Sequence, residues 1–156
     1  MQPDRGTIKK IKGITEEFFQ KMTIEADVSV KLSSEKTFLI NIDVDEPQIL
    51  IGEGGKTLDE IQRLLKVIIK RSIKSEELFF INLDISDYKK KKYQYLKEMA
   101  RSVADEVSLG KKEKTLPPMS PAERRIIHME LAGRTDVVTE SIGEEPERKI
   151  IIKPHP

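Results

Sequence analysis

The chain has 156 residues, enough for one medium-sized domain or two small ones, and 35% of them are charged. The formal net charge of +1 gives no bulk attraction to nucleic acid, and the absence of cysteine excludes disulfides and thiolate metal sites. No segment reaches the length of a signal peptide or a membrane span. We therefore expect a cytoplasmic protein without membrane insertion.

The first part of the chain has the pattern of a helix followed by a β-hairpin. Residues 1–13 are expected to be an N-terminal extension, and apolar residues at helical spacing over 14–22 predict a short amphipathic helix. Apolar and polar residues alternate over 24–32 and again over 38–44. Both runs predict strands with one wet face, joined by the turn at 33–36.

A helix–turn–helix segment and a third strand follow. Pro47 is expected in the first turn of a short helix, and a long helix is expected over about 56–72. Alternation over 79–85 predicts the third strand. The order of these elements is that of a type II KH domain, a three-stranded sheet with helices on one side. We assign residues 14–86 to it.

Residues 87–154 are expected to form a second, small α/β domain, which makes the chain an α+β protein. A long charged helix is expected after Ser86-Asp87. Ser120 and Glu123 have the spacing of a capping box, which predicts the start of another helix. Strands over 137–142 and 148–153 are expected to form a terminal hairpin.

The first candidate RNA-binding motif is the G-x-x-G turn before the long helix. Glycine lets the backbone approach a sugar-phosphate chain, and the amides at a helix N-terminus favour anions. Glu53 would repel phosphate, whereas Lys56 would attract it. A purely structural turn is the alternative. The expected contacts are Gly52, Glu53, Gly54, Gly55 and Lys56.

The second candidate motif is an arginine–histidine pair. Arg124 and His128 are one helical turn apart and point the same way. A guanidinium and an imidazole on one face can bind phosphate and stack on bases. The alternative is a solvated helix face, or an arginine that caps a nearby helix end.

Further basic residues could track a nucleic-acid backbone. Lys89 and Lys90 lie in the lysine- and tyrosine-rich run 88–95, and Arg125 follows Arg124. Lysines interleaved with tyrosines can contact phosphates and stack on bases. We favour the other reading of this run, a charged helix face whose tyrosines are partly buried where the domains join.

No catalytic constellation is recognisable. The sequence has two histidines and lacks HExxH, a nucleophile elbow and a phosphate-gripping GKS or GKT sequence. Asp43, Asp45 and Glu46 could attract a cation, but a solvated turn explains them better. We therefore expect no enzyme activity, no metal and no cofactor.

Three ordered segments together resemble the Jag family (SpoIIIJ-associated proteins, also called EloR or KhpB). Residues 50–62 resemble the family's KH loop and helix, 118–128 its R-x-x-x-H (R-3-H) motif, and 141–154 its terminal hairpin. The resemblance implies a bacterial, cytoplasmic, single-stranded RNA-binding protein that acts in post-transcriptional control linked to cell elongation, division and cell shape. Its implied RNA contacts are Gly52, Gly55, Lys56, Arg124 and His128.

The resemblance also implies partners. These are a small KH protein or a second copy of the chain, and the family is associated with the neighbourhood of the membrane insertase. Many family members have an extra N-terminal domain, which we expect to be missing here because the chain begins almost directly at the KH module.

Two functions compete. The first is binding of single-stranded RNA, or of single-stranded DNA, across both modules. The second is a protein adaptor whose KH fold serves dimerisation or partner binding, which Glu53 and the near-neutral net charge favour. A nuclease would have His128 as its only credible acid–base group, and we set that function aside.

Overall fold

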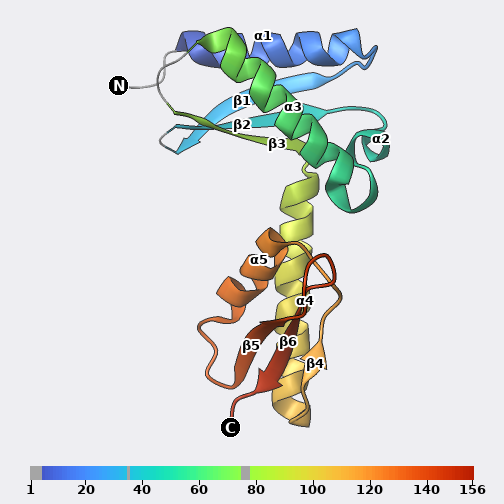
Figure 1. Cartoon of the computed structure of the whole chain (residues 1–156), viewed down its shortest axis with the longest axis vertical. Coiled ribbons are helices and arrows are strands. Elements are labelled where there is room, and N and C mark those ends of the chain that lie inside the picture. The colour runs from blue at the N-terminus through green and yellow to red at the C-terminus, as the bar shows by residue number, and fades with distance from the viewer. Residues whose placement is uncertain (1–4, 35, 75–77) are drawn as a thin grey trace. The chain divides into compact units, whose positions relative to one another are not determined.

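The computed structural model describes residues 5–34, 36–74 and 78–156, and the chain divides into two compact units, residues 1–89 and 90–156. Each unit combines helices with a three-stranded sheet (Figure 1). The predicted α+β class is therefore confirmed.

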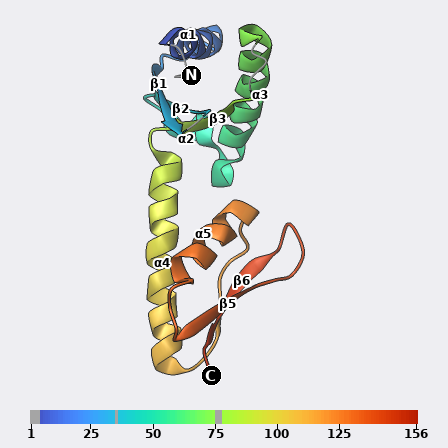
Figure 2. The same cartoon turned by 90° about the vertical axis from the view of Figure 1, so that its left-hand side faces the viewer.

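The N-terminal unit is a sheet covered by helices. Its strands have the order β1-β2-β3, with β1 antiparallel and β3 parallel to β2. The helices α1 and α3 lie on the same side of this sheet (Figure 2). The elements are α1 (Arg5–Lys21), β1 (Asp27–Ser34), β2 (Thr37–Asp43), α2 (Pro47–Ile51), the 3-10 turn η1 (Glu53–Gly55), α3 (Lys56–Ile73) and β3 (Phe80–Ile85).

Alternation along the strands sets which sheet face is buried. In β2 the side chains of Phe38, Ile40 and Ile42 are buried, and the residues between them are more exposed. Leu65 and Ile69 of α3 cover them in the same apolar cluster. Each such side chain contributes about 1.5–3 kcal/mol when it leaves water, which is why the helices stay on this face.

The first helix is longer than the sequence pattern indicated. It begins at Arg5, so most of the expected N-terminal extension is helical, and Ile11 is fully buried in the core of the unit. Gly13 interrupts the apolar spacing, which hid the continuity of the helix. Residues 5–13 therefore help to cover the sheet.

The C-terminal unit packs helices against a second sheet of order β4-β6-β5, and every neighbouring pair is antiparallel. The predicted terminal hairpin is present as β5 and β6. The short β4 was not predicted. The elements are α4 (Tyr88–Gly110), whose first two residues belong to the N-terminal unit, β4 (Lys114–Thr115), α5 (Pro121–Leu131), β5 (Val137–Ile142) and β6 (Lys149–Pro154).

The start of α5 is fixed by its own sequence. The Ser120 hydroxyl accepts a hydrogen bond from the Glu123 amide (3.3 Å), and the Glu123 carboxylate accepts one from the Ser120 amide (2.8 Å). The predicted capping box is therefore confirmed. Burial alone would raise the pKa of Glu123, but hydrogen bonds from Lys92 and Ser120 hold it below its usual value. Lys92 thus ties this end of α5 to α4.

Among the residues that the structure describes, no helix is both long and apolar enough to cross a lipid bilayer.

Candidate nucleic-acid interface

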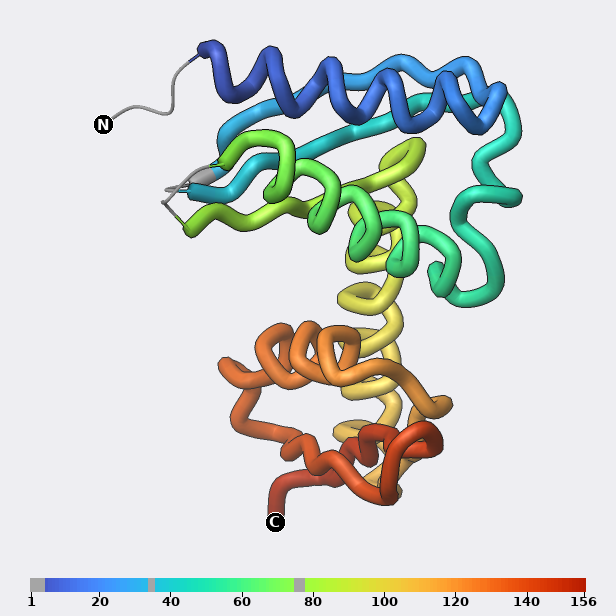
Figure 3. Tube along the Cα trace, turned by 45° about the horizontal axis from the view of Figure 1, so that its top comes forward, coloured from blue at the N-terminus to red at the C-terminus, as the bar shows by residue number. Residues whose placement is uncertain are grey.

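Gly52 is a structural glycine in the tight turn that leads from α2 into α3, which the Cα trace in Figure 3 shows as the segment just before the long green helix. Its φ of 70° and ψ of −178° lie in a region essentially restricted to glycine, and its amide donates to the Gln48 carbonyl (3.0 Å) at the end of α2. A Cβ built at this position would collide with the side chain of Thr57. The turn therefore requires glycine here for its own geometry.

The accessible part of the turn is at its centre. Gly54 is exposed with a φ of 61°, and a Cβ added there would meet no atom within 4 Å. Gly55 is buried instead, and a Cβ on it would lie 3.0 Å from the Tyr88 ring. Glu53 and Lys56 are exposed on either side. A strand that follows this turn would meet residues 53, 54 and 56 before it met Gly55.

The placement of Gly55 corrects the expectation that both outer glycines offer open backbone. Tyr88, from the first turn of α4, covers Gly55 within the N-terminal unit. The sequence indicated a partly buried tyrosine in this region, but not its partner. The contact joins segments far apart along the chain, so periodicity could not reveal it.

Lys89 is half-buried in the N-terminal unit and is not the free surface cation that its sequence context suggested. Its ammonium donates to Gln62 Oε1 (2.7 Å) and to Asn82 Oδ1 (3.3 Å). Burial lowers the pKa of Lys89 by more than the nearby Asp59 and Asp84 raise it. Lys89 therefore connects α3 to β3.

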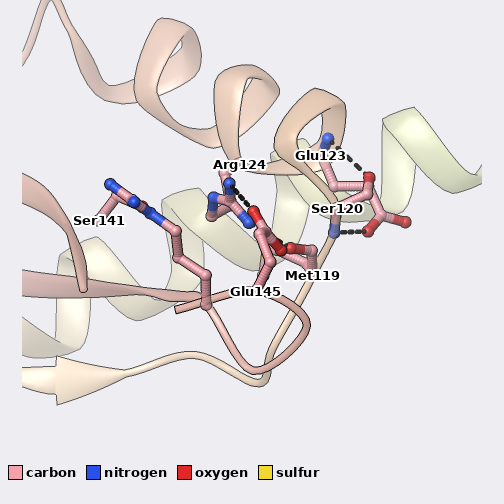
Figure 4. Close-up of polar contacts among 7 residues, drawn as sticks. Met119, Ser120, Glu123, Arg124, Ser141 and Glu145 are labelled. Atoms are coloured by element: carbon pink, nitrogen blue, oxygen red, sulfur yellow. Dashed lines mark hydrogen bonds and ion pairs between the residues drawn. The ribbon is translucent and has the colours of Figure 1, made fainter. Parts of the chain in front are cut away.

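In the C-terminal unit, Arg124 is buried and engaged. It is 8% exposed, and its guanidinium donates to the Met119 carbonyl and to Glu145 Oε1, both at 2.6 Å (Figure 4). Glu145 lies in the turn between β5 and β6, and its side chain is 51% exposed. This corrects the expectation of an open arginine, because the guanidinium joins α5 to the hairpin turn.

His128 lies one turn along α5 on the same face and is half-buried. Its Nδ1 is 2.7 Å from the Thr139 hydroxyl on β5. Burial, and secondarily the positive charge of Arg124, lower the pKa of His128 from its usual 6.5. The imidazole is therefore held neutral more readily than a free histidine, and an added anion would reverse this.

Sequence patterns missed the groups on the hairpin that complete this cluster. Arg148, just before β6, donates from Nε to the Ser141 hydroxyl (2.8 Å) on β5. Ser141 and Thr139 are two residues apart on one strand, so their side chains share a face. An arginine next to the exposed turn of a predicted hairpin was the only available signal. Of the remaining predicted cations, Lys90 and Arg125 are exposed.

Among the described residues, no three His, Cys, Asp or Glu side chains gather as a possible metal site.

Comparison with known proteins bears on this cluster. The family model for the R-3-H domain matches residues 94–154, which include Arg124 and His128. "RNA-binding protein KhpB" of Clostridium symbiosum is 38% identical over 138 residues, and that of Bacillus subtilis (strain 168) is 32% identical over 130. This chain contains an R-3-H domain and is related to KhpB. The predicted resemblance to the Jag family is thus confirmed.

The match covers most of this chain but less of its relatives. It includes 88% of this chain and 61% of the Clostridium symbiosum protein. For the KhpB of Lactiplantibacillus plantarum, 32% identical over 133 residues, the shares are 85% and 40%. The R-3-H domain of this chain therefore supplies α4, α5 and the terminal hairpin, while relatives of this length hold further sequence.

Proposed function

We propose that this chain binds single-stranded RNA, with contacts from each of its two units. The observation that carries the proposal is the Arg124–His128 pair within an R-3-H domain, in a chain whose relatives bear the name RNA-binding protein. Phosphate and exposed bases are the groups that guanidinium and imidazole side chains recognise in a single strand.

We further propose that residues 14–86 form a type II KH domain and 87–154 the R-3-H domain. The support for the first is the element order α1-β1-β2-α2-α3-β3 with a glycine turn between α2 and α3, and a parallel pairing of β2 with β3. In such a domain the strand crosses the glycine turn, where the N-terminus of α3 and the exposed Lys56 favour phosphate.

In this proposal the protein is a non-enzymatic, cytoplasmic regulator that acts after transcription, in processes linked to cell elongation and division. Its partner is single-stranded RNA, and a second copy or a small KH protein completes the assembly. The relatives' name supports the RNA partner, and the Jag resemblance alone suggests the cellular process.

The direct test is fluorescence anisotropy with a labelled single-stranded oligoribonucleotide, compared with the same sequence as a duplex. Affinity should fall as salt rises, because each lysine or arginine at a phosphate releases a counterion. Equal binding of duplex and single strand, or no salt dependence, would contradict the proposal. Intact RNA after prolonged incubation with divalent cations would agree with a non-enzymatic role.

Gly54→Asp should weaken RNA binding about ten-fold. Asp tolerates the left-handed backbone of Gly54, where its side chain meets open space, so the turn should keep its shape. The added carboxylate would repel phosphate next to Glu53. Gly54→Asn is the matched control because it has the same shape without the charge. Equal affinities of the two variants would remove the glycine turn from the proposed interface.

RNA affinity should rise as pH is lowered from about 7.5 to about 5.5 if a phosphate approaches His128. The pKa of His128 is lowered in the free protein, and a phosphate would raise it, so binding would take up a proton. His128→Gln should flatten the dependence of the anisotropy-derived Kd on pH, whereas His155→Gln should not.

The same lowered pKa affects stability in the opposite direction. As pH falls below 6.5, the unfolded chain is protonated before the folded one, so stability that is present above this pH is progressively lost. Circular dichroism at each pH therefore has to accompany the binding curves. A pH dependence that persists in His128→Gln would assign it to another group.

A further inference from the structure

The β5–β6 turn places a carboxylate where an anion would meet the arginine of the R-3-H motif. Gly143 turns the chain with a φ of 86°, and the residues that follow include three exposed glutamates, Glu144, Glu145 and Glu147. Of these, Glu145 reaches Arg124 at 2.6 Å. Glu144 and Glu147, both within the described part of the chain, have no ion pair. One acidic side chain of three is therefore singled out by contact.

We propose that Glu145 is an intramolecular placeholder for a backbone phosphate at Arg124. A carboxylate and a phosphate both accept hydrogen bonds from the fork of guanidinium donors, so one can replace the other on the same N–H groups. The inference rests on the proposed RNA function and deepens it, because it names the group that RNA displaces.

The difference in burial between the two partners makes the exchange possible. The Arg124 side chain is 9% exposed, so its charge needs an anionic partner at all times. The Glu145 side chain is 51% exposed, so water can solvate it once it leaves. Ion pairs with an exposed partner contribute little to stability. A phosphate can therefore take the place of Glu145 without leaving a buried charge unpaired.

The rest of the guanidinium environment holds Arg124 ready for the exchange. Its second contact is with the Met119 carbonyl (2.6 Å), which precedes the capping box of α5 and does not involve the turn (Figure 4). This contact keeps the guanidinium in place when Glu145 departs. His128, one turn along, and Arg148, at the base of the turn, lie on segments that contact β5 and would flank the incoming strand.

The test compares two glutamines in the same turn. Glu145→Gln keeps an oxygen that accepts from Arg124 but removes the competing charge, and RNA affinity should rise about three- to five-fold, the size expected of an exposed ion pair. Glu144→Gln removes the same charge from a neighbour without the contact, and it should change the affinity less than about two-fold. Fluorescence anisotropy with a single-stranded oligouridylate at fixed salt gives both values.

A second measurement covers the arginine itself. In NMR spectra of the full chain labelled with nitrogen-15, the Arg124 side-chain Nε–H signal should shift on addition of the oligouridylate. Glu145→Gln alone should also move it. The same variant made in an Arg124→Met background should give no gain in affinity. A gain that persists there would overturn the exchange.

The outcomes separate this inference from the proposed function. If the wild-type chain binds the oligouridylate but Glu145→Gln binds equally or more weakly, Glu145 is a structural partner and the placeholder role is wrong. Equal gains in Glu144→Gln and Glu145→Gln would assign the effect to net charge and also overturn it. If neither the wild type nor Glu145→Gln binds, the proposed function and the inference fail together.

Discussion

Gly52→Ala is expected to destabilise the N-terminal unit by about 3 kcal/mol. Two effects add. The φ of 70° with ψ of −178° is a conformation that side chains with a Cβ scarcely adopt, and the new Cβ would also collide with Thr57 at the start of α3. Relief of either would pull α3 away from α2 and disturb the helix that covers the sheet.

Chemical denaturation followed by circular dichroism, together with hydrogen exchange resolved by segment, would measure this change. The loss of protection should be confined to residues 5–89. Gly13→Ala is the control, because Gly13 lies within α1 and a Cβ there meets nothing within 4 Å. It should raise stability by about 0.5–1 kcal/mol. If Gly52→Ala were as stable as the wild type, the glycine would be retained for contact with a ligand and not for the turn.

Arg124→Ala is expected to destabilise the C-terminal unit by about 2 kcal/mol. The change leaves the Met119 carbonyl without its donor, removes the link from α5 to the β5–β6 turn, and deletes the packed stem of an arginine that is 8% exposed. Because Glu145 is half in water, its release adds little to this loss. The same variant should also bind RNA more weakly, since the proposed phosphate contact is gone.

Arg125→Ala is the matched comparison for stability. It removes the same charge from the next residue, whose side chain is exposed, so its stability should stay within about 0.5 kcal/mol of the wild type. Hydrogen exchange in residues 90–156 gives both values. Arg124→Ala with unchanged protection of the hairpin would show that the buried contacts hold nothing in place. In that case the value of the arginine would lie entirely in binding.

These two variants show that motif residues can be structural and functional at once. Gly52 shapes the turn that displays Gly54, and Arg124 holds the hairpin whose glutamate occupies its guanidinium. A loss of RNA binding in either variant would therefore be ambiguous on its own. Gly54→Asp and Glu145→Gln change the charge at exposed positions, so they report on binding with less effect on folding.

Much of the fold could be predicted from the sequence by itself, because the signals are local. The alternation that predicts β2 and β3, the proline at the start of α2 and the capping box of α5 all act within a few residues. The same holds for the glycine turn and for the spacing of Arg124 and His128. These features determined the α+β class, the two-unit organisation and the candidate motifs.

Only the tertiary structure decided which of those motif residues are accessible. Tyr88 covers Gly55, Gln62 and Asn82 engage Lys89, and Glu145 reaches Arg124 across 21 positions of the chain. The addition of β4 to the second sheet is decided in the same way. Each of these contacts joins residues that no periodic pattern relates, and each forms only when burial of the two apolar cores brings distant segments together.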